Sequence, residues 1–186
     1  MDLVGRDALL REMAAHLTLG RSVLLFGPEG VGKTAVIQAG AVPGLTIVDP
    51  FEHVSTVAAF RIRRAMDRGA VFLAAARTTD RRVLGHVGRV LWRMRTMRVM
   101  PLTAAEIRLV IERQLARAQI ETGTLPPGWL NAAAAEAAGL PGQAILLVGA
   151  AARRWRATGA WPPPGFALAV ARDEAWRGPS QPFRGR

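Results

Sequence analysis

The chain has 186 residues, enough for one domain with a full hydrophobic core or for a core domain with a small helical appendage. No stretch approaches the ~20 apolar residues of a membrane-spanning helix, and the N-terminus lacks the basic flank and apolar run of a secretion signal. A cytoplasmic location is therefore expected. With no cysteine and three scattered histidines, the sequence excludes disulfide frameworks, thiolate metal sites and histidine clusters.

The formal charge of +11 is unevenly distributed along the chain. Residues 1–60 carry a net charge of −2, residues 61–98 carry eleven Arg against two Asp for a net +9, and residues 99–186 carry +4. The middle segment is the candidate for contact with the phosphate backbone of DNA or with an acidic partner. The alternative is a solvated surface in an Arg-rich chain, because no helix-turn-helix, zinc-finger or aromatic RNA-binding signature accompanies these arginines.

Hydrophobic periodicity predicts alternating helices and strands in the first hundred residues. The predicted helices cover residues 7–18, 34–39, 55–68 and 81–92, and the predicted strands cover 22–26, 45–48, 70–76 and 97–100. Consecutive strand and helix units of this kind imply an α/β fold, in which a parallel sheet with right-handed crossovers carries helices on both faces.

The sequence of the second half of the chain predicts helices only. A capping box at Thr103–Glu106 opens a helix to about Gln119, and further helices are predicted over 129–138, 143–157 and 166–176. Residues 162–165, Pro-Pro-Pro-Gly, read as a stiff spacer rather than a packed element. We expect a core over 1–120, a small helical lid over 121–160, and a Pro-rich spacer, short helix and basic tail over 161–186.

Residues 27–34 match the pattern Gly, four residues, Gly-Lys-Ser/Thr between a predicted strand and a predicted helix, which predicts that the core over 1–120 binds a nucleotide. Such a turn points backbone N–H groups inward and delivers phosphates to a helix N-terminus. Lys33 is expected to reach the terminal phosphates and Thr34 to help hold Mg²⁺, while Gly30 and Gly32 leave room for the close approach of phosphate oxygens. The residues expected to bind the nucleotide are Gly27, Pro28, Glu29, Gly30, Val31, Gly32, Lys33 and Thr34.

Lys33 is also the only lysine among the 25 basic residues of the chain. An Arg-rich composition that retains lysine at this one position fits a site where a compact ammonium on a flexible stem is required. A lysine left there by chance is the alternative.

A phosphate-binding loop needs a carboxylate at the end of a neighbouring strand to position Mg²⁺, and Asp49 follows the strand over 45–48. The alternative for Asp49 is an ordinary strand-ending turn residue. Hydrolysis also needs a group that orients the attacking water. Glu52 is the nearest acid, and its alternative is a favourable charge at the start of a helix.

Several elements stand in the order of a known family: Val4-Gly5-Arg6 before the first helix, the loop over 27–34, a strand ending at Asp49, Arg77 after a later strand, and Gly139-Leu140-Pro141 between two late helices. Over residues 3–157 the chain resembles an AAA+ P-loop ATPase, most of all the origin-recognition and STAND (NB-ARC-like) branch. The resemblance implies ATP or ADP with Mg²⁺ as ligands, held by Thr34 and Asp49 on the metal side.

The resemblance also implies roles for residues outside the loop. Val4, Gly5 and Arg6 would lie near the adenine, and Arg77 would be the sensor-1 residue that reads the γ-phosphate. Pro141 would pack the lid against the nucleotide.

Arg89 stands where the family has an arginine finger, with Arg93 as the alternative. A finger of this kind acts in the site of a neighbouring copy, which implies a homo-oligomer.

Two departures from the family pattern affect the prediction. Fourteen residues separate Thr34 from Asp49, where the family has a further strand and helix, so a trimmed sheet of about four strands is expected. Gly142-Gln143 replaces the sensor-2 Arg, and Pro50 occupies the position that directly follows the Mg²⁺ carboxylate. The sequence therefore predicts an ATP-binding ATPase or nucleotide-dependent switch, a candidate for action on DNA. The alternative is a hydrolysis-deficient scaffold or regulatory protein-interaction module.

Overall fold

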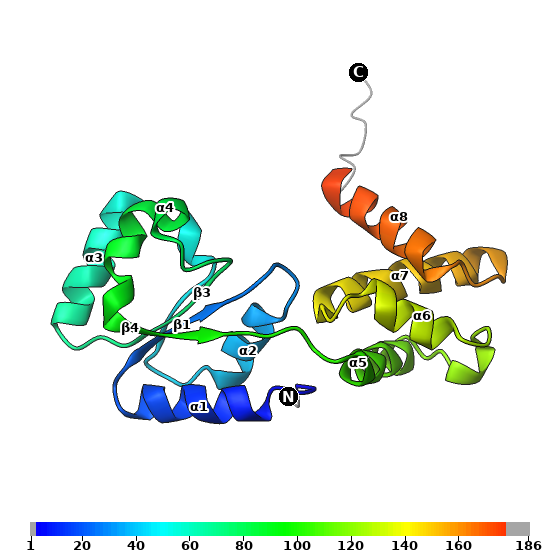
Figure 1. Cartoon of the computed structure of the whole chain (residues 1–186), viewed down its shortest axis with the longest axis horizontal. Helices are drawn as coiled ribbons and strands as arrows, with labels where there is room; N and C mark the ends of the chain where they lie inside the picture. Colours follow the sequence, from blue (N-terminus) through cyan, green and yellow to red (C-terminus); the bar gives the residue numbers. More distant parts are fainter. Residues whose placement is uncertain (1–2, 178–186) are drawn as a thin grey trace, which may run out of the picture. The chain divides into compact units, whose positions relative to one another are not determined.

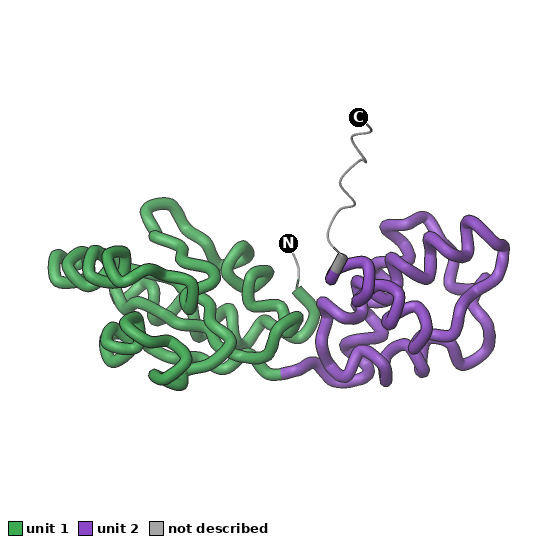
Figure 2. Tube along the Cα trace, turned by 90° about the horizontal axis from the view of Figure 1, so that it is seen from above, with its two compact units in different colours: residues 1–100 green, residues 101–186 purple. Residues whose placement is uncertain are grey.

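The computed structural model describes residues 3–177. The chain divides into two compact units, residues 1–100 and residues 101–186 (Figure 2). None of the helices in the described part is long and apolar enough to cross a membrane.

The first unit is built on four parallel strands in the order β2-β3-β1-β4. The strands are β1 (Ser22–Phe26), β2 (Thr46–Val48), β3 (Phe72–Ala76) and β4 (Met94–Arg98). Leu24 of β1 lies opposite Ala74 of β3 and Thr96 of β4, which sets the register. The predicted α/β fold with a trimmed parallel sheet of four strands is confirmed.

Helices cover both faces of this sheet (Figure 1). The helices α1 (Asp7–Thr18) and α2 (Lys33–Gly40) lie on one face, and α3 (Thr56–Asp67) and α4 (Arg81–Leu84) lie on the other. On the α3 side, Ala59 and Ile62 pack in one buried cluster with Leu24 and Ala74. Because the central strands are buried on both faces, they read in the sequence as continuous apolar runs.

The segment between β3 and β4 differs from the prediction. Instead of one helix over 81–92, the chain forms the short α4 and the 3-10 segments η2 (Gly85–Arg89) and η3 (Leu91–Arg93), and β4 begins at Met94 rather than residue 97. Gly85 ends α4 with a φ of 55°, and a Cβ on Gly88 would lie 3.3 Å from the Arg81 Cα. The two glycines therefore fold the chain tightly where its apolar spacing alone suggested a continuous helix.

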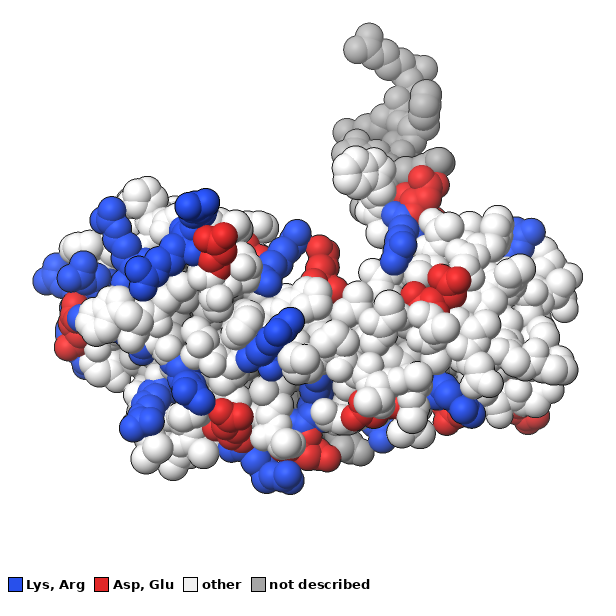
Figure 3. Space-filling view, viewed as in Figure 1, with Lys and Arg blue, Asp and Glu red and all other residues white. Residues whose placement is uncertain are grey.

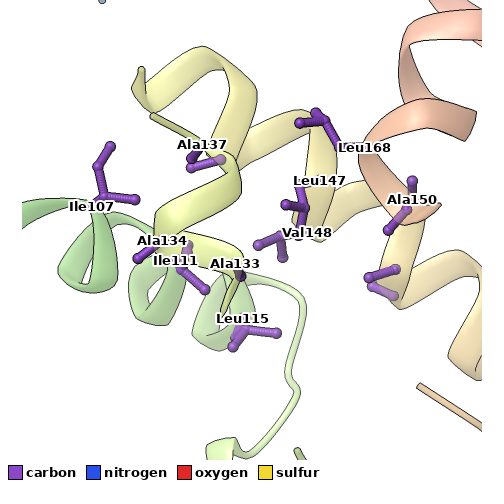
Figure 4. Close-up of a cluster of buried hydrophobic side chains, with 14 of the residues drawn as sticks. Ile107, Ile111, Leu115, Ala133, Ala134, Ala137, Leu147, Val148, Ala150 and Leu168 are labelled. Atoms are coloured by element: carbon purple, nitrogen blue, oxygen red, sulfur yellow. The ribbon is translucent and has the colours of Figure 1, made fainter. Parts of the chain in front are cut away.

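The second unit contains α5 (Ala104–Arg117), η4 (Thr122–Thr124), α6 (Trp129–Glu136), α7 (Pro141–Thr158) and α8 (Pro164–Arg177). Ile107, Ile111 and Leu115 of α5 face Ala133 and Ala134 of α6, while Leu147 and Val148 of α7 and Leu168 of α8 complete the same core (Figure 4). The helix α5, which the sequence prediction grouped with the core over 1–120, thus packs within the second unit.

Residues 162–165, which the sequence suggested as a stiff spacer rather than a packed element, are packed, and the last two of them begin α8. The Trp129 Nε1–H donates a buried hydrogen bond of 2.9 Å to the Pro162 carbonyl. The Trp161 ring contacts both Trp129 and Trp155, with its centroid 5.3 Å from each of theirs. Burial of these aromatic rings holds the proline run against the helices. The predicted basic tail beyond Arg177 lies outside the described residues.

Arg6 anchors the N-terminal segment within the first unit. Its Nη1 donates to the Met100 carbonyl at 2.7 Å and its Nη2 donates to the Val31 carbonyl at 2.9 Å. The side chain is buried, with 7% of the residue exposed. A buried guanidinium bonded to two backbone carbonyls connects the segment before α1 to the phosphate-loop sequence and to the chain leaving β4.

We predict that Arg6→Met lowers the free energy of unfolding by about 2–4 kcal/mol, because the methionine fills the space and leaves both carbonyls without this donor. Urea unfolding followed by circular dichroism measures the change. Arg11→Met, at an exposed position of α1, is the control and should change stability by less than about 0.5 kcal/mol. Equal, small effects of the two substitutions would contradict the anchoring role of Arg6.

Candidate nucleotide-binding site

The loop over residues 27–34 follows β1 and enters α2 in a conformation that depends on glycine. A Cβ on Gly27 would lie 2.7 Å from the Val99 carbonyl oxygen, a distance that side chains do not tolerate. Gly30 and Gly32 have φ values of 77° and 99°, and Gly32 is the N-cap of α2. Both positions require a left-handed backbone, which explains the spacing of glycines in the motif.

Val31 anchors the loop, since its side chain is fully buried. Its carbonyl accepts the hydrogen bond from Arg6, and the Gly32 carbonyl accepts the first bond of α2 from the Val36 N–H at 3.1 Å. The helix N-terminus therefore stands directly behind the loop, where its dipole favours an anion.

Lys33 lies folded over its own loop. Its Nζ donates to the Gly27 carbonyl at 2.7 Å and to the Pro28 carbonyl at 2.9 Å. Burial lowers the pKa of Lys33 below its ordinary value of 10.5, while Glu52 and then Asp49 act to raise it. The desolvation effect exceeds the attraction of the two carboxylates.

Asp49 stands one residue beyond β2 and meets the start of α2. The Thr34 hydroxyl donates a hydrogen bond of 2.6 Å to Asp49 Oδ2. The two predicted metal-binding residues are therefore in contact. Residues 3–177 contain no cluster of three or more His, Asp or Glu side chains that could hold a metal on their own. A hydroxyl and one carboxylate fit Mg²⁺, which completes its shell with water and substrate phosphate oxygens.

Arg77, directly after β3, connects two acidic residues of the site. Its backbone N–H donates to Glu52 Oε1 at 3.3 Å, and its Nε lies 3.6 Å from the same oxygen. Its Nη2 lies 3.1 Å from Glu29 Oε2, on the phosphate loop. The Glu52 side chain is only 10% exposed, and its buried Oε2 has no hydrogen-bond partner among the described residues. No sequence signal pointed to the bridge from Arg77 to Glu29.

Val4, Gly5, Arg6 and Pro141 are the remaining residues that were predicted to lie near the nucleotide. Val4 is half-buried and Gly5 exposed, while the Arg6 guanidinium is occupied by backbone carbonyls. Pro141 is the first residue of α7 in the second unit. The proposed positions of Val4, Gly5, Arg6 and Pro141 beside a nucleotide stay predictions.

The two arginine-finger candidates differ in their surroundings. Arg89 is exposed at the end of η2. Arg93 forms an ion pair with Asp67, and its Cζ lies 4.7 Å from the centre of the Trp92 ring. Arg89 is therefore the more available of the two for a neighbouring molecule, and its role stays a prediction.

The fold has well-defined counterparts among solved structures. The RuvB Holliday junction branch migration motor of Thermotoga maritima matches with a TM-score of 0.58 and 16% identity, over 90% of this chain and 68% of that one. The Orc1 protein of Aeropyrum pernix, solved in complex with DNA, matches with a TM-score of 0.63 and 20% identity, over 95% and 66%. Domain III of the Thermotoga maritima replication initiation protein DnaA matches with a TM-score of 0.65 and 13% identity, over 89% of both chains.

No protein-family model and no curated protein sequence matches the chain. The structural likeness at 13–20% identity therefore establishes the fold. The resemblance read from the sequence is thereby confirmed at the level of the fold: the chain has the fold of the AAA+ P-loop ATPases.

Proposed function

We propose that this chain is an ATP-binding, Mg²⁺-dependent AAA+ ATPase or nucleotide-dependent switch. The observation that carries the proposal is the contact between Thr34 at the start of α2 and Asp49 beyond β2, beside a lysine that lies on the phosphate loop. This arrangement joins a metal-binding pair to a phosphate-binding turn, which is the combination that phosphoryl transfer requires.

Each residue of the site has a distinct role in this proposal. When ATP binds, the Lys33 ammonium leaves the Gly27 and Pro28 carbonyls and contacts phosphate oxygens. Thr34 and Asp49 hold the metal. When bound, ATP would supply the γ-phosphoryl group that passes to water, and Mg²⁺ would neutralise charge on the phosphate oxygens. The buried Glu52 carboxylate orients that water. The Arg77 guanidinium leaves Glu29 and contacts the γ-phosphate.

A switch without efficient turnover is the second candidate. The Glu52 carboxylate is engaged by Arg77 on one oxygen, and Pro50 stands where the family has its water-orienting residue. Gly142-Gln143 also replaces the sensor-2 Arg. In that case ATP binding would change the conformation of the site and hydrolysis would be slow.

Assembly and DNA contact complete the proposal. Arg89 of one copy would act in the site of the next, and the Arg-rich segment 61–98 would contact DNA phosphates. Two neighbours in fold support the DNA part, since one is a Holliday junction branch migration motor and another was solved with DNA. A cytoplasmic location stays a prediction from the sequence.

Lys33→Ala should weaken ATP binding by at least about tenfold, because it removes the ammonium that would contact the phosphates. Lys33→Arg should also weaken binding, since a planar guanidinium does not replace a compact ammonium in this turn. Isothermal titration calorimetry measures both, with Arg11→Ala on exposed α1 as the control. ATP binding that is unchanged in Lys33→Ala would refute the proposed site.

The pKa of Lys33 gives a pH-dependent test, since a single lysine makes acylation of its amine traceable by peptide mapping. Reaction with an amine-specific reagent should reach its half-maximal rate below pH 10.5, because burial favours the neutral amine. Asp49→Asn and Glu52→Gln should move this midpoint lower still, because each removes a charge that raises the pKa. Glu12→Gln on α1 should leave it unchanged, and bound ATP should protect the amine. A midpoint at or above 10.5 contradicts the described geometry.

Hydrolysis tests the roles of Glu52 and Arg89 together. Each of Glu52→Gln and Arg89→Ala should abolish most phosphate release, since one removes the water-orienting group and the other the finger. An equal mixture of the two variants should regain about a quarter of the wild-type rate, because random assembly pairs an intact site with an intact finger at that frequency. Arg95→Ala, at an exposed position of β4, is the control. A mixture that stays inactive would contradict a finger supplied by a neighbouring copy.

A further inference from the structure

Arginines and aromatic rings lie along the outer side of α3 and continue onto η3. We call Phe60, Arg61, Arg63, Arg64, Arg68 and Trp92 the α3–η3 strip. All six side chains are exposed, while Ala59 and Ile62 turn the opposite side of α3 into the core. In Figure 3 basic side chains gather over the part of the first unit that holds α3 and α4.

The positive charge of this strip is not neutralised within the described chain. Among residues 3–177, the structure gives Arg61, Arg63, Arg64 and Arg68 no carboxylate partner. The two acidic residues of the region are engaged elsewhere. Asp67 pairs with Arg93, and the Asp80 carboxylate caps α4 by accepting from the Arg82 N–H at 2.8 Å. The surface therefore presents a field that attracts a polyanion.

The two aromatic rings distinguish this strip from an ordinary solvated basic surface. Phe60 is 64% exposed and Trp92 is 69% exposed. Arg93 lies over the Trp92 ring and is fixed there by its ion pair with Asp67. Asp67 stands seven residues, and hence two helical turns, after Phe60 on the same side of α3. Asp67, which pairs with the Arg93 that lies over Trp92, is thus about 10 Å from Phe60 along the helix axis, with Arg61, Arg63 and Arg64 between them in the sequence.

We propose that the α3–η3 strip binds single-stranded nucleic acid, with Phe60 and Trp92 stacking on bases and the arginines contacting phosphates. The inference rests on the proposed contact of residues 61–98 with DNA. It adds that the bound form is single-stranded and that Phe60 and Trp92 select this form. Exposed rings next to unpaired arginines match the two components of single-strand recognition, stacking platforms and an electrostatic track. A duplex or an acidic protein would use the charges, but neither presents free base faces to the rings.

The test compares a 30-nucleotide oligo-dT with a duplex of equal length by fluorescence anisotropy, with and without ATP. The wild-type chain should bind the single strand more tightly. The double variant Phe60→Leu with Trp92→Leu keeps apolar bulk and loses both rings, so its affinity for the single strand should fall at least about tenfold, while duplex binding stays unchanged. Trp176→Leu removes a ring that is 90% exposed on α8 and should have no effect.

The charges are tested separately. Arg61→Ala with Arg64→Ala should reduce the slope of log K against log salt by about 1.4 for the single strand, at ~0.7 per lost phosphate contact. Arg11→Ala, an exposed arginine on the other side of the sheet, should leave the slope unchanged. Circular dichroism and ATP binding of each variant verify that the fold is intact.

The outcomes separate this inference from the proposed function. If single strand and duplex bind equally and the ring variants behave like wild type, the stacking inference fails and the DNA contact stands. If heparin of matched charge competes as well as oligo-dT, the strip is a general polyanion surface and the inference also fails. Absence of binding to either DNA overturns both the inference and the DNA part of the proposal, while ATP affinity decides the nucleotide site independently.

Discussion

Parallel pairing of β1 with β3 and β4, and of β3 with β2, places the carboxyl ends of all four strands at one edge of the sheet. The phosphate loop follows β1, Asp49 follows β2 and Arg77 follows β3, while the Val99 carbonyl beyond β4 closes against Gly27. Residues as far apart in the sequence as Gly27 and Val99, 72 positions, therefore become neighbours because the parallel strands all end at this edge. The chemistry of the site depends on this constraint before it depends on any single side chain.

The basic residues of the site differ in how firmly they are bound to the protein. Arg6 is buried on two backbone carbonyls and acts as part of the structure. Lys33 also lies on two carbonyls, but its flexible stem lets the ammonium move to another acceptor, and burial already disfavours its charged form. A phosphate offers that ammonium the negative charge that neutral carbonyls lack.

Short sequence patterns predicted most of the features that depend on neighbouring residues alone. The loop, Asp49 at a strand end and the capping box of α5 all follow from short-range backbone requirements, and the structure contains each of them. Tertiary packing decided the rest. Gly85 and Gly88 broke a predicted helix, Trp161 turned a predicted spacer into a packed segment, and α5 took its partners from the second unit. The bridge from Glu29 to Arg77 has no local signature, since it joins residues 48 positions apart.

Under the proposed function, that bridge would shape how the site responds to a nucleotide. The ion pair between Arg77 and Glu29 is largely exposed, with side chains 61% and 76% accessible, so it contributes at most about 1 kcal/mol. The contact of Arg77 with the buried Glu52 carboxylate is more enclosed, and the second oxygen of Glu52 has no hydrogen-bond partner in the structure. An anion with more than one negative charge can therefore draw the guanidinium away from Glu29 at little cost. The Arg77 backbone N–H would still donate to Glu52 Oε1, and the buried Oε2 favours recruitment of a water molecule as a donor.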